Sequence, residues 1–191
     1  RSSLTRFGPH RIRGLASQTS SGAGEADLGL YVHVPFCEHV CPYCDFDVIG
    51  VRRLAERDER EFVDLVLREF DLARERVAGR EIATVYFGGG TPALLSPASI
   101  SRLLAAFAAE LRFASPEITV ELNPGQLEVA RVPALREAGV TRLSLGVQAF
   151  DDEVLRRLGR AQKGREALRG LEACLAAGFP TLAIDLIYGA P

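Results

Sequence analysis

Tyr31-Val-His-Val-Pro-Phe-Cys37-Glu-His-Val-Cys41-Pro-Tyr-Cys44 is the stretch that indicates most about this chain. Its three cysteines have the spacing C-x3-C-x2-C and lie within eight residues. Spacings this short let one loop curl so that all three sulfurs face one centre. Thiolates are soft ligands that favour iron–sulfur clusters, zinc or copper(I). The stretch therefore predicts a metal-binding loop, which follows an apolar run typical of a strand.

Other interpretations of the cysteines differ in what they require. A structural zinc site needs four protein ligands, and His39 or His33 would complete a Cys3His set. Disulfides are disfavoured because a chain with a large aliphatic core needs no such staples. Three cysteines on one iron–sulfur cluster leave one iron without a protein ligand, and an open metal position is where chemistry takes place. Cys174 lies in an apolar helical segment, and we expect it to be a small core residue.

Composition limits the class of protein. The 191 residues are 47% hydrophobic and 25% charged with a net charge of −2, which is ordinary for an α/β domain. The charge balance does not favour nucleic acid as a partner. No apolar run approaches the roughly 18 residues of a membrane helix. The chain contains no methionine and stops where a strand would pass into a loop, so we expect it to be part of a longer protein.

Residues 1–27 differ from the remainder, residues 28–191, which we expect to form one domain. They are rich in Ser, Gly and Arg and contain no acidic residue before Glu25. This composition predicts a disordered tail. It is also the signature of an organelle transit segment.

Short apolar runs alternate with longer helical patterns from residue 28 onward. The predicted strands cover residues 30–36, 82–87, 118–122, 143–148 and 182–187. The predicted helices cover residues 52–77, a segment beginning at 97, a broken segment ending near 138, and residues 152–158 and 165–177. Such alternation predicts βαβ units and a parallel sheet, either in part of a barrel or in an open doubly wound sheet.

Polar and small residues gather at the carboxyl ends of the predicted strands, which is the edge where parallel α/β folds form their sites. These residues are Cys37, Gly88 to Thr91, Glu121, Asn123, Gln148 and Asp185.

The run Gly88-Gly89-Gly90-Thr91-Pro92 permits close approach of backbone to a ligand and leaves N–H groups free. It also suits a plain strand-to-helix turn. Phosphate binding is a rival interpretation, but the Gly-Lys-Ser/Thr ending of a P-loop is absent.

Charged and amide side chains near these strand ends are further candidates. Glu121 and Gln148 can bind hydroxyls and amines, or can be solvated loop residues. Arg160 can pair with a carboxylate, or can lie on the surface. Asp185 is a charge in an apolar strand and needs a partner. His33 shares strand parity with Tyr31 and is expected to point into the barrel, with its role open.

Together these motifs resemble the radical S-adenosylmethionine (SAM) superfamily. The similarity runs from the cysteine loop through Gly88–Pro92, Glu121-Leu-Asn-Pro, Leu143-Ser-Leu-Gly-Val-Gln and Asp185-Leu-Ile-Tyr-Gly, and covers residues 28–191. Within the superfamily the set is similar to the oxygen-independent coproporphyrinogen III oxidases and the related heme chaperones. The resemblance implies a partial (β/α) barrel, with five units visible here and a sixth missing.

The resemblance also implies roles for individual residues. Cys37, Cys41 and Cys44 would bind a [4Fe–4S] cluster, whose open iron chelates SAM before electron transfer cleaves it to methionine and a 5′-deoxyadenosyl radical. The remaining matched positions would contact SAM. Tyr31 and Tyr43 would flank it, Gly89, Gly90 and Thr91 would hold its methionyl end, Glu121 and Gln148 its nucleoside, Arg160 its carboxylate, and Asp185 would make a further contact.

Phe46 bears on the branch of the family. The coproporphyrinogen oxidases usually carry a cysteine at that position, whereas the heme chaperones typically resemble this sequence there and lack that cysteine. The resemblance thus favours a heme chaperone, with heme as a ligand, a heme-receiving client protein and an electron donor as partners. A radical enzyme of porphyrin biosynthesis and a zinc-stabilised interaction module are the alternatives. Reduced thiolates suit the cytosol, and a transit segment would instead indicate a mitochondrion or plastid.

Overall fold

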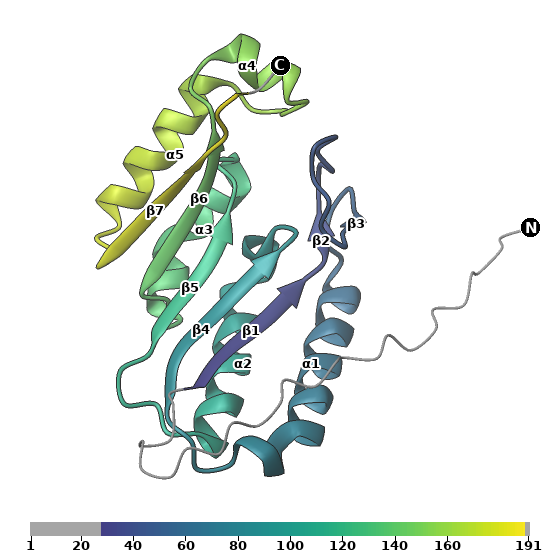
Figure 1. The fold of residues 1–191 in the computed structure, drawn as a ribbon, viewed down its shortest axis with the longest axis vertical. Coiled ribbons are helices and arrows are strands. Elements are labelled where there is room, and N and C mark those ends of the chain that lie inside the picture. The colour runs from purple at the N-terminus through teal and green to yellow at the C-terminus, as the bar shows by residue number, and fades with distance from the viewer. Residues whose placement is uncertain (1–27, 190–191) are drawn as a thin grey trace, which may run out of the picture.

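Strands and helices alternate along the chain and form one parallel sheet covered by helices (Figure 1). The computed structural model describes residues 28–189, apart from the side chains of residues 126 and 127. The five strands of the sheet hydrogen-bond in the order β1-β4-β5-β6-β7, and every neighbouring pair is parallel. Their bounds are Leu28–Val34 (β1), Ile82–Gly89 (β4), Glu117–Leu122 (β5), Arg142–Gln148 (β6) and Thr181–Leu186 (β7). The last four predicted strands and the parallel arrangement are therefore confirmed, whereas the first strand covers Leu28–Val34 instead of residues 30–36.

Helices connect successive strands. Their bounds are Glu56–Val77 (α1), Pro92–Leu94 (η1, a 3₁₀ turn), Pro97–Glu110 (α2), Gln126–Glu137 (α3), Asp152–Arg157 (α4) and Gly164–Ala176 (α5). Helix α1 contacts α2, α2 contacts α3, and α3 contacts α5, so the long helices form one layer along the sheet. Helix α2 begins as predicted after Ser96, whose hydroxyl accepts a hydrogen bond from the Ser99 N–H, with Pro97 at its first position.

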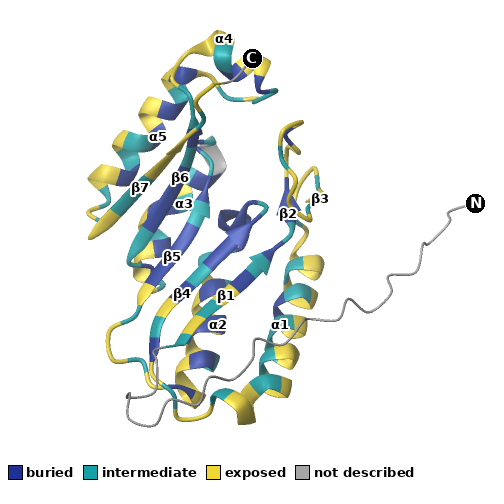
Figure 2. Ribbon diagram, viewed as in Figure 1, coloured by how far each residue is buried: buried dark blue, intermediate teal, exposed yellow. Residues whose placement is uncertain are grey.

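Successive side chains of a strand point to opposite faces of the sheet, and the buried residues are concentrated on β4, β5 and β6 (Figure 2). Side chains such as Val34, Val85, Phe87 and Leu143 are fully buried in the hydrophobic core. Burying a large aliphatic or aromatic side chain contributes about 1.5–3 kcal/mol, so this face accounts for much of the stability. The alternate positions carry polar or small side chains, which leaves the other face available for chemistry.

The segment between β1 and α1 departs from the predicted single strand over residues 30–36. Strand β1 ends at Val34, and Phe36–Cys37 (β2) instead pairs with Ile49–Gly50 (β3) in a separate small parallel sheet. Pro35 lies at the break, and it has no N–H to continue the ladder with β4. Its carbonyl accepts a hydrogen bond from the Ile49 N–H at 2.7 Å, which starts the new pairing.

Helix α1 begins at Glu56, four residues later than predicted. Acidic residues Glu56, Asp58 and Glu59 occupy its first turn, where they complement the positive end of the helix dipole.

Among residues 28–189, no helix has the length and apolar composition needed to cross a membrane.

Candidate functional site

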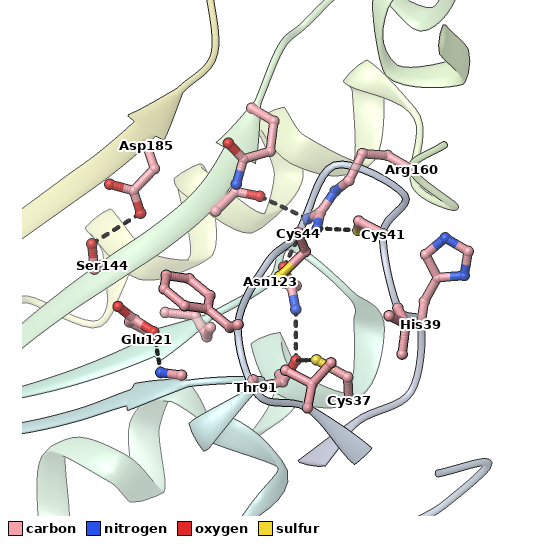
Figure 3. A pocket seen from close by; sticks show the side chains of 18 of the residues that line it. Cys37, His39, Cys41, Cys44, Thr91, Glu121, Asn123, Ser144, Arg160 and Asp185 are labelled. Atoms are coloured by element: carbon pink, nitrogen blue, oxygen red, sulfur yellow. Dashed lines mark hydrogen bonds between the residues drawn. The ribbon is translucent and has the colours of Figure 1, made fainter. Parts of the chain in front are cut away.

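A cavity of about 360 Å³ lies at the carboxyl ends of the strands, under the loop that carries the three cysteines (Figure 3). Eleven of the twelve predicted site residues line it. They are Cys37, Cys41, Tyr43, Cys44, Gly89, Gly90, Thr91, Glu121, Gln148, Arg160 and Asp185. Five strand ends therefore contribute to one site, as the positions of these residues in the sequence indicate.

The three cysteines of the loop are free thiols that face this common cavity. Cys37 and Cys41 are buried and Cys44 is half-buried. A turn closed by the hydrogen bond from the Cys44 N–H to the Cys41 carbonyl, at 3.0 Å, holds the last two together. Burial raises the pKa of the Cys37 thiol, although the Thr91 hydroxyl opposes this shift. Cys174 is buried in α5 within the core, which confirms the prediction made for it.

A chain of hydrogen bonds joins two of the cysteines through groups that follow β4, β5 and α4 (Figure 3). Cys37 Sγ and Thr91 Oγ1 lie 3.4 Å apart, and Asn123 Nδ2 donates to Thr91 Oγ1 at 3.1 Å. Arg160 donates from Nη2 to Asn123 Oδ1 at 2.7 Å and from Nη1 to Cys41 Sγ at 3.4 Å. This network fixes the guanidinium beside the cysteine loop.

Arg160 also donates from Nη2 to the Gly146 carbonyl at 2.9 Å, so the hydrogen bonds of this guanidinium engage three of its five N–H donors. Its Nε is buried and has no hydrogen-bond partner among the described residues. A buried, unpaired N–H of a cation is costly and normally finds an acceptor. Arg160 lines the cavity, so its guanidinium can pair there with an anionic group such as a carboxylate.

Glu121 is held at both carboxylate oxygens. The Tyr86 hydroxyl donates to Oε1 at 2.6 Å, and the Gly89 N–H donates to Oε2 at 3.0 Å. Gly89 has φ = +111°, a conformation that glycine adopts readily. A Cβ there would lie 2.6 Å from the His33 ring, so the position excludes side chains for two reasons.

Gln148 and Asp185 close the far side of the cavity. Gln148 ends β6 with φ = +65°, an uncommon conformation for a residue with a side chain, and such positions cluster at functional sites. The Ser144 hydroxyl donates to Asp185 Oδ2 at 3.1 Å, which gives this carboxylate the partner that its apolar strand requires.

Tyr31 is the one predicted site residue that does not line the cavity. The residue is 58% exposed, and its ring stacks on the Tyr86 ring at a centroid distance of 6.1 Å. Its hydroxyl lies 3.1 Å from His33 Nδ1, so the two side chains share a strand face as predicted.

Neither candidate histidine directs its Nε2 at the thiols. His33 Nε2 donates to the Asp47 carbonyl at 2.9 Å, and His39 Nε2 donates to the Gly159 carbonyl. Across residues 28–189, no three His, Cys, Asp or Glu side chains converge closely enough to share one metal ion. A [4Fe–4S] cluster does not require such convergence, because each thiolate binds a separate iron. Three free thiols on one loop match the ligand set of a [4Fe–4S] cluster with one open iron.

Sequence reasoning assigned no role to Tyr86, Asn123 or Ser144, although all three line the cavity. Asn123 was recognised only as a residue at a strand end. Tyr86 and Ser144 lie within predicted strands, and strand parity places Tyr86 on the opposite face from the buried Val85 and Phe87. The alternation of side chains along the strand is therefore the sequence pattern that could have predicted Tyr86 as a residue of the cavity face.

Comparison with known proteins gives a consistent result. The family model described as the Radical SAM superfamily matches residues 31–191. The chain is 39% identical over 165 residues to the heme chaperone HemW of Escherichia coli, covering 86% of this chain and 43% of that protein. It is 37% identical over 168 residues to the oxygen-independent coproporphyrinogen III oxidase of the same bacterium, covering 87% of this chain and 36% of that protein.

The structure of the coproporphyrinogen III oxidase HemN from E. coli, described as a radical SAM enzyme, is similar with a TM-score of 0.76 and 35% identity. That match covers 86% of this chain and 38% of the solved chain. This chain therefore spans less than half the length of the relatives it matches.

Proposed function

Because the chain belongs to the radical SAM superfamily, for which a [4Fe–4S] cluster and SAM are the implied cofactors, we propose that Cys37, Cys41 and Cys44 hold the cluster and that SAM occupies the adjoining cavity. The chemistry that the bound groups supply in such a site is one-electron reductive cleavage of SAM. The observation that carries the proposal is the meeting of three free thiols and the Arg160 guanidinium at one cavity.

Each residue of the site then has a separate role in holding the cluster or SAM. The thiols lose their protons on binding metal. The Arg160 guanidinium pairs with the carboxylate of SAM, and Asn123 and Cys41 hold that guanidinium in place. Gly89 and Gly90 lack side chains where backbone must approach the ligand, and Thr91 lies against Cys37. Glu121 accepts hydrogen bonds from hydroxyl groups of the nucleoside, while Gln148, Asp185, Tyr43 and the neighbouring Tyr31 bound the remaining space.

For the whole protein we propose a heme chaperone, which binds heme and transfers it to client proteins. The chaperones HemW of E. coli and Bacillus subtilis, at 39% and 34% identity, support this branch. So does Phe46, which lines the cavity with 65% of its surface exposed and offers no thiol to a substrate. The second candidate is a coproporphyrinogen III oxidase or another radical SAM enzyme of porphyrin biosynthesis, favoured by the 37% identity to that oxidase.

The proposed partners are heme, a heme-receiving client and an electron donor, with no nucleic acid. We propose a cytosolic setting, because a thiolate-bound cluster needs reducing surroundings. The predicted tail or transit segment, residues 1–27, lies outside the described residues.

Two assays on anaerobically reconstituted protein separate the candidates. A chaperone should bind heme stoichiometrically in a visible-absorption titration and pass it to an apo-hemoprotein. An oxidase should release 5′-deoxyadenosine only when coproporphyrinogen III is added. Heme binding without transfer, together with turnover of coproporphyrinogen III, would reject the chaperone in favour of the oxidase. Stoichiometric zinc without iron would reject both.

A further inference from the structure

Tyr86 is a polar group on the cavity wall with no role in the proposed cluster or in the predicted SAM contacts. It lies in the middle of β4, between the buried residues Val85 and Phe87, and strand alternation turns it to the opposite face. Its hydroxyl reaches Glu121 on the neighbouring strand β5 and donates to Oε1 at 2.6 Å. That distance is short, as expected for a hydrogen bond to a charged acceptor.

The Tyr86 ring is held in place by its neighbours. It stacks on Tyr31 from β1 with an interplanar angle of 24°. Gly88 makes room for both rings, because a Cβ on that residue would lie 2.8 Å from Tyr86 and 2.9 Å from Tyr31. The phenol is therefore fixed by packing before any ligand binds, so its hydrogen bond loses little entropy.

The carboxylate that receives this bond is fixed in turn. Glu121 accepts from Tyr86 at one oxygen and from the Gly89 N–H at the other. Two ionised oxygens offer about four lone-pair positions, so roughly half remain free toward the cavity. Burial, together with the Glu121 carboxylate, raises the pKa of Tyr86 to about 12. The phenol keeps its proton at neutral pH and remains a donor.

We propose that Tyr86 is a positioning residue, which orients the Glu121 carboxylate so that its free lone pairs accept hydrogen bonds from the ribose hydroxyls of SAM. Tyr86 acts through Glu121 and does not touch the reacting atoms. The inference rests on the SAM-binding part of the proposed function and is independent of heme. It predicts that Tyr86 matters only for ligands that carry the ribose hydroxyls.

Binding of stable analogues tests this without turnover. S-adenosyl-L-homocysteine carries both ribose hydroxyls, and its 2′-deoxy and 3′-deoxy analogues each lack one. Dissociation constants are measured by calorimetry on the full chain with reconstituted cluster, for wild type and Tyr86→Phe. We expect Tyr86→Phe to weaken the binding of S-adenosyl-L-homocysteine about tenfold, because a misoriented Glu121 carboxylate would lose one hydrogen bond from a ribose hydroxyl. At least one deoxy analogue should change by no more than about twofold.

Two further variants complete the design. Tyr188→Phe is the control. It removes a hydroxyl from a residue that is 98% exposed, and it should leave all the dissociation constants unchanged. Glu121→Gln should abolish the effect of Tyr86→Phe in the double variant, because the two residues would act as one unit.

The outcomes separate failure of the inference from failure of the proposed SAM binding. If Tyr86→Phe weakened the binding of all three ligands equally, Tyr86 would have a structural role only, and the inference alone would be overturned. No binding of S-adenosyl-L-homocysteine to wild type would overturn the SAM-binding proposal and the inference with it. Because the comparison is made between ligands on one protein, a partly destabilised variant still decides the question.

Discussion

Two adjacent residues of β4 show how the two faces of the sheet differ. Phe87 points into the helix-covered core and is fully buried, whereas Tyr86 points to the cavity and bonds Glu121. The same contrast repeats on β5 and β6, where Val120 and Leu143 belong to the hydrophobic core and Glu121 and Ser144 line the cavity. Because side chains alternate along a strand, stability and chemistry are assigned to opposite faces. Substitutions on one face should therefore leave the property of the other largely intact.

The largest expected effect concerns the cysteine loop. Cys41→Ala should lose essentially all cluster iron, because two thiolates cannot hold a cluster that uses three. Iron and sulfide analysis after anaerobic reconstitution measures this. Cys174→Ala is the matched control on the core side and should retain full iron with a small loss of stability. Equal iron contents in the two variants would contradict the assignment of the cavity thiols.

The second effect concerns the core face. Phe87→Ala should lower the free energy of unfolding by about 3–5 kcal/mol, because it removes a fully buried ring and leaves a cavity. Tyr86→Phe next to it should cost less, about 1.5 kcal/mol, since it loses the hydrogen bond to Glu121 while the ring and its stacking remain. Urea unfolding of both variants gives the comparison. Similar losses for the two would mean that the faces are not separate.

The third effect concerns the Arg160 guanidinium and the affinity of the cavity for a ligand carboxylate. Arg160→Lys should weaken binding of S-adenosyl-L-homocysteine about 10- to 100-fold, because lysine cannot keep the Asn123 and Cys41 contacts and also bind a carboxylate. Arg156→Lys is the control, since that side chain is exposed and pairs with Glu153. Calorimetry should show wild-type affinity for Arg156→Lys. Unchanged affinity in Arg160→Lys would remove this residue from the site.

The smallest effect depends on pH. Glu59 on α1 accepts a hydrogen bond from the Ser96 N–H at 2.6 Å. Burial raises its pKa, but the hydrogen bonds from Ser96 and Ser99 outweigh this and the net pKa is lowered. Its stabilising contribution is therefore present at neutral pH and is lost as pH falls below the ordinary glutamate value of about 4.3.

Glu59→Gln should thus lower the melting temperature slightly at pH 7, and the difference from wild type should shrink toward pH 3. Thermal unfolding monitored by circular dichroism across this range measures it. A difference that grows as pH falls would contradict the sign of the shift. Cluster content should stay unchanged, since Glu59 belongs to the helix layer.

Local patterns predicted most of what the structure shows. Alternation of apolar runs placed the strands, and their carboxyl ends placed the cavity. Long-range contacts were not predictable in this way, because Arg160 and Cys41 meet only through tertiary structure across 119 residues. The break at Pro35 and the positive φ of Gln148 also depend on how the cysteine loop and β7 pack, which spacing does not encode.

Electron paramagnetic resonance of the reduced, reconstituted protein, recorded with and without SAM, tests the central claim most directly. An iron left open by the three cysteines should give a [4Fe–4S]⁺ signal whose g values shift when SAM is added. That shift should disappear in Cys41→Ala together with the cluster. A cluster whose signal is the same with and without SAM, or protein that takes up zinc and no iron, would contradict the account.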